Sequence, residues 1–143
     1  MAALKATIVM EKPRLFQAHG YTGVTVPIHF PKEGEARIGP SPMEMVLLGV
    51  GGCTAIDIVD ILQKERETVE AFRVEMEAEK ATELPHAFTH IHMKYVLRGD
   101  IKDANVRRAI DLSMEKYCSA SIMLKRGGVE VTTSYEIERP GGN

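Results

Sequence analysis

The chain of 143 residues contains two cysteines, Cys53 and Cys118, which stand 65 residues apart. A thiolate can attack a peroxide oxygen and become a sulfenic acid, and a second thiol can then condense with it to a disulfide. This chemistry requires a lowered pKa at the first thiol. The plainer interpretation is that both cysteines are buried and pack as small hydrophobic residues. The spacing leaves both interpretations open, because residues so far apart in sequence need not meet in the fold.

A basic partner would be needed to favour a thiolate at Cys53. The dipole of a helix acts mainly in its first turn, and Cys53 lies three turns into a helix that we expect to begin at Pro42. Asp57 lies one turn further on, and its carboxylate would raise the pKa of the thiol. The candidate cations are Arg37, just before the helix, and Arg14, on a strand. Each of them is otherwise a solvated surface charge.

Other motifs give no sign of a reaction centre. The histidines that cluster in sequence, His86, His90 and His92, have no cysteine or carboxylate beside them at the spacing of a zinc site. The glycine pairs match no phosphate-binding fingerprint. The serines Ser41, Ser119 and Ser121 lack the context of a nucleophile elbow. We therefore expect no bound metal and no bound cofactor.

Composition narrows the class of protein further. A net charge of −2 gives no reason to expect nucleic acid or an anionic membrane as a partner. No apolar run reaches the roughly 18–20 residues that span a bilayer, and the N-terminus lacks the features of a signal peptide. We expect a cytoplasmic protein with free or reversibly oxidised thiols. Its length fits a single domain over residues 1–143.

Residues 39–67 form the segment around which the chain is organised. Ser41, Pro42 and Glu44 predict a capped helix start. The residues that follow are apolar on every side, which is typical of a helix buried on most sides. Gly51 and Gly52 inside this helix cost roughly 1 kcal/mol each relative to alanine, so we expect close packing to compensate.

Alternating apolar residues predict strands on both sides of the long helix. The expected strands cover residues 3–10, 14–19, 24–30, 68–82, 88–98 and 129–137. Pro27 places the third of them at a sheet edge. Further helices are expected over 104–117 and 119–124, and the tail 139–143 is expected to fray. This order predicts an α+β fold with antiparallel sheets around a long buried helix. Because one small domain supplies too little cover for that helix, we expect a homodimer.

Two segments taken together resemble the OsmC/Ohr family of osmotically inducible and organic-hydroperoxide-resistance proteins. They are S-P-M-E-M-V-L-L-G-V-G-G-C-T-A-I-D-I and E-K-Y-C-S-A-S-I-M-L, and the likeness extends over about residues 36–137, most closely to the YhfA-like branch. The resemblance implies an intertwined homodimer with active sites at its interface. It also implies a thiol-dependent peroxidase for organic hydroperoxides without metal or haem. Cys53 would be the peroxidatic cysteine, Cys118 the resolving one, and an external thiol the reductant.

The sequence departs from this family at the groups that activate the first thiol. Better-known members use an arginine and a glutamate, and the glutamate stands ten residues before the cysteine, where this chain has Met43. The nearest acid, Glu44, is nine residues before it. Ten steps on a regular helix place two residues about 80° apart, and nine place them about 180° apart. Arg37 and Glu44 are thus the loosely matched candidates for the activating pair.

This departure leaves a second function open. The alternative is a dimer without enzymatic activity that binds an apolar or thiol-bearing ligand between its subunits, or that senses redox state. The eight methionines would suit an adaptable apolar pocket, although they also suit ordinary core packing.

Overall fold

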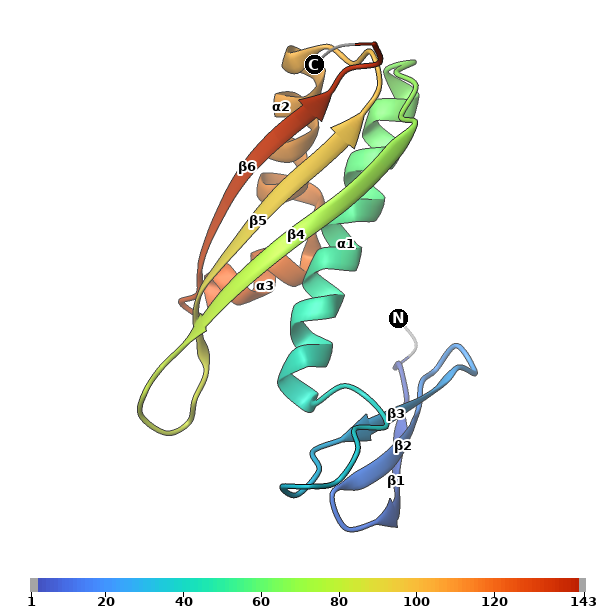
Figure 1. Cartoon of the computed structure of the whole chain (residues 1–143), viewed down its shortest axis with the longest axis vertical. Coiled ribbons are helices and arrows are strands. Elements are labelled where there is room, and N and C mark those ends of the chain that lie inside the picture. The colour runs from blue at the N-terminus through green and yellow to red at the C-terminus, as the bar shows by residue number, and fades with distance from the viewer. Residues whose placement is uncertain (1–2, 142–143) are drawn as a thin grey trace. The chain divides into compact units, whose positions relative to one another are not determined.

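The computed structural model describes residues 3–141, and the chain divides into two compact units that are described separately. The first unit covers residues 3–48 and the second residues 49–141 (Figure 1). The long helix α1 (Pro42–Lys64) begins in the first unit and continues in the second. The order of strands and helices confirms the predicted α+β fold class.

The first unit is built on a three-stranded antiparallel sheet in the order β1-β2-β3. Its strands are β1 (Thr7–Lys12), β2 (Leu15–His19) and β3 (Thr25–His29). Pro27 has no N–H to donate and lies in the edge strand β3, as predicted. The loop after β3 is anchored at His29, which is buried. Its Nδ1 accepts from the N–H of Ile38 at 3.0 Å, and its carbonyl oxygen accepts from Arg37 Nη1 at 2.8 Å.

The second unit contains a three-stranded sheet with β5 in the centre. Its strands are β4 (Ala71–Lys80), β5 (Phe88–Arg98) and β6 (Glu130–Glu138). The pairing of β4 with β5 is antiparallel, whereas β5 and β6 are parallel, which is an exception to the antiparallel arrangement expected from sequence. A parallel pair needs a crossover connection. It consists of α2 (Asp103–Leu112), the π-helical turn η1 (Ser113–Tyr117) and α3 (Ser119–Arg126).

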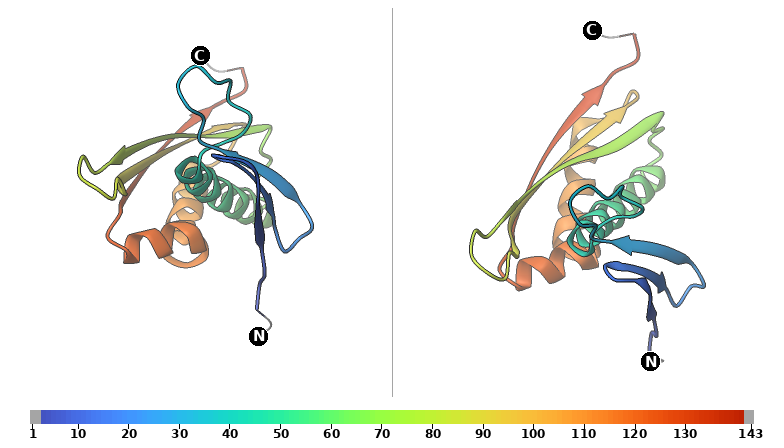
Figure 2. Two further views of the ribbon diagram at one scale, coloured as in Figure 1. Left: turned by 90° about the horizontal axis from the view of Figure 1, so that it is seen from below. Right: turned by 60° about the horizontal axis from the view of Figure 1, so that its bottom comes forward.

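The helices of the second unit lie on one face of its sheet (Figures 1 and 2). The buried side chains of β5 include Ile91, Met93, Tyr95 and Leu97, as the alternation predicted. Apart from Gly51, the buried residues of α1 form a stripe with a spacing of four: Val50, Thr54, Ile58 and Leu62. The core of this unit lies between this stripe, one face of β5 and the buried side of α2.

Gly51 shows the close packing that the sequence led us to expect. A Cβ atom at this position would lie 2.5 Å from the sulfur of Met76 on β4, so a larger residue would force the Met76 side chain to move. A Cβ at Gly52 would meet no atom within 4 Å. Packing within the described part of the chain thus accounts for Gly51 but not for Gly52.

The opposite face of α1 is uncovered in a single chain, as expected if one chain supplies too little cover for this helix. Ile56 is 66% exposed, and Val46 and Leu48 are exposed as well. By length and composition α1 could cross a membrane, so the statement that no apolar run is long enough was wrong. The core helix of a water-soluble protein passes the same test, and the finding is weak evidence by itself.

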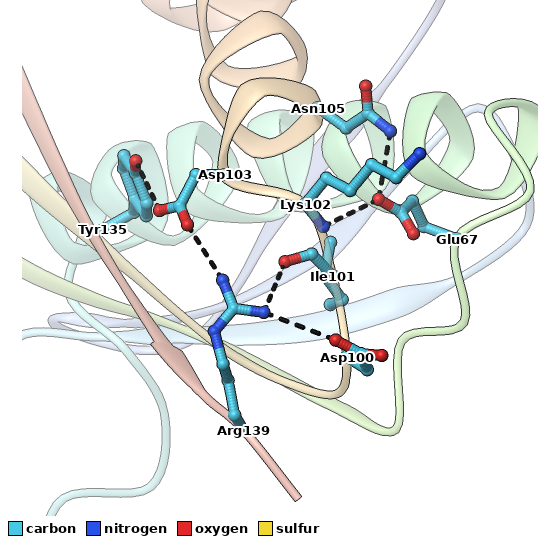
Figure 3. A network of polar contacts seen from close by, with 8 residues as sticks. All are labelled: Glu67, Asp100, Ile101, Lys102, Asp103, Asn105, Tyr135 and Arg139. Carbon is cyan, nitrogen blue, oxygen red and sulfur yellow. Dashed lines mark hydrogen bonds and ion pairs between the residues drawn. The ribbon is translucent and has the colours of Figure 1, made fainter. Parts of the chain in front are cut away.

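A polar network joins the end of β6 to the start of α2 (Figure 3). Arg139 donates to the carbonyl oxygen of Ile101 at 2.9 Å and to Asp103 at 2.8 Å, and it forms an ion pair with Asp100 at 3.5 Å. The hydroxyl of Tyr135 also donates to Asp103, at 3.0 Å. The prediction of a frayed tail over 139–143 was therefore wrong at Arg139. Residues 142–143 of that tail lie outside the described residues.

Glu67 supplies the cap that α2 lacks in its own sequence (Figure 3). The N-cap residue Lys102 has no capping side chain, but its backbone N–H donates to Glu67 Oε2 at 2.9 Å. Asn105 Nδ2 donates to the same oxygen at 3.0 Å. The N–H of Lys102 is the main reason why the pKa of Glu67 lies below its ordinary value of 4.5.

We expect Glu67→Ala to lower the free energy of unfolding at neutral pH by about 0.5–1 kcal/mol, as for the loss of a partly exposed helix cap. Because folding lowers the pKa of Glu67, its stabilisation is present above the ordinary value and is lost as the pH falls through the lower folded value. Urea unfolding at pH 7 and at pH 3 measures both effects. Glu70→Ala, an exposed acid on the same segment, is the control. If Glu67→Ala lowered the free energy of unfolding as much at pH 3 as at pH 7, the ionised Glu67 carboxylate would not be the stabilising group.

Candidate functional site

The structure brings the two predicted redox cysteines together in the second unit. Cys53 lies on α1, and Cys118 follows η1 and forms the N-cap of α3. The two sulfur atoms and a carboxylate oxygen of Asp57 all lie within 4.8 Å of one another. Both thiols are free. Their proximity was open from the sequence and is the central observation at this site.

The π-helical turn η1 places Cys118 beside α1. The N–H of Cys118 donates to the carbonyl oxygen of Ser113 at 2.7 Å, which closes a turn of five residues. On a regular α-helix, residues five apart point about 140° away from each other. In the wider turn both can face α1: Ser113 Oγ reaches Asp57, and the sulfur of Cys118 lies near that of Cys53. The helix predicted to run to residue 117 therefore ends at Leu112, and the change of geometry builds the site.

The two thiols lie in different surroundings. Cys118 is fully buried, and burial raises its pKa, although the hydroxyl and N–H of Ser121 act in the opposite direction. Cys53 is partly exposed. A reagent from solution can therefore reach the thiol of Cys53 more readily than that of Cys118.

The pKa of Cys53 is lowered by the N-terminus of α3. Burial, the largest single influence, and the charge of Asp57 raise this pKa. They are outweighed by the backbone N–H of Ala120, the thiol of Cys118 and the hydroxyl of Ser119, whose oxygen lies 3.8 Å from the sulfur. The first N–H groups of a helix have no partner inside it and favour an anion.

These donors were missed in the sequence, where we expected an arginine to be needed. A short helix over 119–124 was predicted, and its start at the residue after Cys118 was the available signal. Only the fold shows that this start lies against Cys53. The groups that lower the pKa of Cys53 are uncharged, so this shift does not depend on a basic partner.

A buried chain of hydroxyl groups holds Asp57. Ser113 Oγ donates to Asp57 Oδ2 at 3.0 Å and lies 2.8 Å from Thr54 Oγ1, which lies 2.8 Å from the hydroxyl of Tyr95. Burial raises the pKa of Tyr95 to about 12, although its hydrogen bond to Thr54 opposes this. Tyr95 therefore remains a neutral donor at physiological pH. The chain fixes the carboxylate beside the two thiols.

Glu44 caps α1 within the first unit. Its Oε1 accepts from the N–H of Ser41 at 3.3 Å, and the hydroxyl oxygen of Ser41 accepts from the N–H of Glu44 at 3.2 Å. This reciprocal pair confirms the predicted capping box. Any role of Glu44 at the thiol stays a prediction.

The two candidate arginines also belong to the first unit and have partners there. Arg37 donates to the carbonyl oxygens of His29 and Gly39. The guanidinium of Arg14 lies 5.0 Å from the ring centre of Phe30. Whether either of them serves Cys53 stays a prediction.

The histidines of β5 are engaged with β6. His90 and His92 both hydrogen-bond to Thr132 Oγ1, at 2.9 and 2.7 Å, and His92 also reaches Ser134 Oγ. Their positions follow from the register of the parallel pair, in which His92 lies opposite Thr132.

A cleft of about 380 Å³ opens in the second unit beside Asp57. Its walls come from the second half of α1 and from α2 and η1, and they include Arg108, Leu112 and Tyr117. Arg108 forms an ion pair with Glu65 at 3.3 Å along the wall. Neither cysteine lines this cleft, so Asp57 is the residue that connects it with the thiol pair.

Fold and site together define a small α+β protein with a thiol pair between a long helix and the start of a short one. The chain belongs to the OsmC-like protein family, whose model matches residues 32–134. Protein YhfA of Escherichia coli K12 is 52% identical to it over 99 residues, which cover 68% of this chain and 73% of YhfA. These matches confirm the family inferred from the two cysteine motifs.

Solved structures show the same fold. A hypothetical protein from Aquifex aeolicus VF5 is 24% identical with a TM-score of 0.86, and the match covers 98% of this chain and 99% of that one. An organic hydroperoxide resistance protein OsmC from Legionella pneumophila is 16% identical with a TM-score of 0.71, covering 95% of this chain and 98% of that one.

We expect Cys53 to react with iodoacetamide faster than Cys118 at neutral pH, because only Cys53 is both exposed and favoured as a thiolate. Ser119→Ala removes one donor to its sulfur. It should slow the labelling of Cys53 by a factor of about two to ten, because this is the effect on the thiolate that the net free energy of one hydrogen bond corresponds to. Mass spectrometry after timed labelling distinguishes the two sites.

Ser134→Ala is the matched control, because Ser134 is a serine of the same unit that contacts His92 and neither thiol. Equal labelling rates for wild type and Ser119→Ala, or faster labelling of Cys118, would contradict the assignment of the N-terminus of α3 as the source of thiolate stabilisation.

Proposed function

We propose that the protein reduces organic hydroperoxides, with Cys53 as the attacking thiol and Cys118 as the resolving thiol. The observation that carries this proposal is the pair of free thiols within 4.8 Å, one partly exposed with a lowered pKa and the other buried with a raised pKa. Membership of the OsmC-like family and the likeness to a protein named for organic hydroperoxide resistance support it.

The first step forms a sulfur–oxygen bond. The thiolate of Cys53 attacks one oxygen of the hydroperoxide, the O–O bond breaks, and its electron pair leaves on the alkoxide, which takes up a proton and departs as the alcohol. The sulfur is oxidised by two electrons to a sulfenic acid. The N–H of Ala120 and the hydroxyl of Ser119 favour the reactive anion without a fixed cation.

The second step forms the disulfide. The sulfur of Cys118 attacks that of the Cys53 sulfenic acid, the S–O bond breaks, and hydroxide leaves with the thiol proton as water. The two sulfur atoms must approach to about 2.05 Å. Cys118 lies at the junction of η1 and α3, where its backbone is extended rather than helical, so a local movement there can close the gap. An external dithiol, which a cytoplasmic location would provide, restores both thiols by exchange.

Single-turnover oxidation of the reduced protein by cumene hydroperoxide tests this function. We expect the wild type to consume one equivalent of hydroperoxide per chain and to end as the Cys53–Cys118 disulfide. Cys53→Ser should lose the reaction, and Cys118→Ser should stop at the sulfenic acid after one equivalent. Free thiols, trapped sulfenic acid and the disulfide are followed by mass spectrometry.

Oxidation no faster than that of free cysteine, or no disulfide within the chain, would rule out the peroxidase function. The alternative of a dimer that binds an apolar ligand or senses redox state would then be preferred, and a molecule that co-purifies with the protein would become the object of study.

The same assay addresses the predicted activating pair. If Arg37 orients the peroxide or the thiolate, Arg37→Ala should slow the oxidation of Cys53, whereas Arg14→Ala should not. Glu44→Gln keeps the capping box, because glutamine also serves at this position. Unchanged stability with a slower oxidation in Glu44→Gln would assign Glu44 to catalysis, and an unchanged rate would leave it as a cap. Thermal unfolding controls for structural damage.

We further propose a homodimer in which a second chain covers the outer face of α1. The support is the apolar surface around this site: Ile56 and Met123 are each 66% exposed and Tyr117 is 50% exposed. Light scattering should give twice the chain mass. Ile56→Lys should shift the protein towards the monomer, while Glu130→Lys, an exposed position on β6, should leave the mass unchanged. A monomeric wild type at micromolar concentration would contradict the dimer.

A further inference from the structure

Asp57 completes a group of three metal-ligand atoms with the two cysteines. Within residues 3–141, the sulfur atoms of Cys53 and Cys118 and a carboxylate oxygen of Asp57 lie within 4.8 Å of one another. We propose that the reduced protein binds one Zn²⁺ ion through these three residues. This metal binding is a property separate from peroxide reduction and does not depend on it.

The donor set suits zinc in type and distance. Zn²⁺ binds thiolate sulfur at about 2.3 Å and carboxylate oxygen at about 2.0–2.2 Å in a tetrahedral arrangement. These bond lengths place the ligand atoms of one ion roughly 3.6–3.8 Å apart. The three atoms of this site, which lie within 4.8 Å of one another, therefore need to approach by about 1.2 Å at most. Three protein ligands also leave the fourth position for water, as in open zinc sites.

The charge of the site favours a divalent cation. The carboxylate of Asp57 lies within 4.8 Å of both sulfur atoms, so it repels a thiolate at either cysteine. None of the ion pairs among the described residues involves Asp57. A Zn²⁺ ion would replace the two thiol protons and turn this repulsion into three favourable bonds.

The carboxylate is already held as a metal ligand would be. Ser113 Oγ donates to Asp57 Oδ2 at 3.0 Å and is itself held by Thr54 at 2.8 Å. The hydrogen bond from Ser113 uses one lone pair of Oδ2, so Oδ1 can still bind a metal ion. Hydrogen bonds from outside the ligand set orient metal ligands in this way. The cleft beside Asp57 and the partial exposure of Cys53 provide an entry path.

This inference departs from the expectation that the chain holds no metal. That expectation rested on the histidines, which bind hydroxyl and carbonyl oxygens instead. The site joins two residues one helical turn apart on α1 to a cysteine within the crossover, between η1 and α3. No contiguous sequence motif marks such a set.

Competition with a chromophoric chelator, under anaerobic conditions and with the reduced full-length protein, tests the proposal. We expect one Zn²⁺ per chain. Co²⁺ in its place should show a thiolate-to-metal charge-transfer band and the intense visible bands of a tetrahedral ion. Asp57→Asn should weaken Zn²⁺ binding by at least about 100-fold, since even the loss of an outer partner costs 10–100-fold. Asp60→Asn, an acid on the same helix and in the wall of the same cleft, should bind like the wild type.

Alkylation of both thiols in the wild-type protein removes two ligands without a mutation, and it should abolish binding. The proposal is overturned if alkylated protein keeps the metal, or if Asp57→Asn and Asp60→Asn bind equally well. The result is separable from peroxide reduction, because binding is measured without peroxide and oxidation is measured in metal-free protein. If both properties hold, Zn²⁺ should slow the oxidation of Cys53, and a chelator should restore it.

Discussion

The buried chain of hydroxyl groups from Tyr95 to Asp57 is the constraint on which the site depends. Each hydroxyl has one proton to donate, and an ionised carboxylate only accepts. One direction satisfies every group: Tyr95 donates to Thr54, Thr54 to Ser113, and Ser113 to Asp57. An unsatisfied buried polar group costs about 1–3 kcal/mol, and no buried side-chain nitrogen or oxygen in the described residues lacks a partner. The chain therefore holds β5, α1 and η1 in one arrangement.

The same arrangement determines where the thiols meet. Cys53 directly precedes Thr54, and Cys118 closes the turn that Ser113 opens. Anchoring Thr54 to Ser113 thus brings the start of α3 to Cys53 as a consequence. A backbone N–H at a helix start is a fixed donor that needs no long side chain to be ordered, so the thiolate is favoured at little entropic cost. This source of stabilisation differs from the arginine that the sequence led us to expect, and it lowers the pKa of Cys53 although the charge of Asp57 raises it.

Sequence patterns predicted the elements well where one face of an element is buried. The alternation in β4 and β5 and the capping box at Ser41 and Glu44 all reflect local physics, and each is seen in the structure. The parallel pairing of β5 with β6 was not predictable in this way, because alternation records which face is buried and not which way a neighbour runs. The π-helical turn was hidden for a similar reason: residues 104–117 fit a helical face only loosely, and the turn is stabilised by contacts with α1. At the site, Cys53 and Cys118 were candidates because two thiols can form a redox pair, and the family motifs suggested the role of each. The N–H of Ala120 has no side-chain signature at all.

Burial of Cys118, together with the balance of charge in the site, explains why its two thiols differ. Two like charges about 4 Å apart cost up to about 4 kcal/mol at an effective dielectric constant of 20. Asp57, held by Ser113, and a thiolate at Cys53, held by the start of α3, already account for two charges, and a third on Cys118 would repel both. Without a cation, Cys118 therefore keeps its proton. In the proposed reaction this proton leaves with hydroxide only after Cys53 has been oxidised and has lost its charge, and Cys118 is then free to attack. The burial that makes Cys118 a poor thiol for peroxide thus also delays its ionisation until a sulfenic acid is beside it.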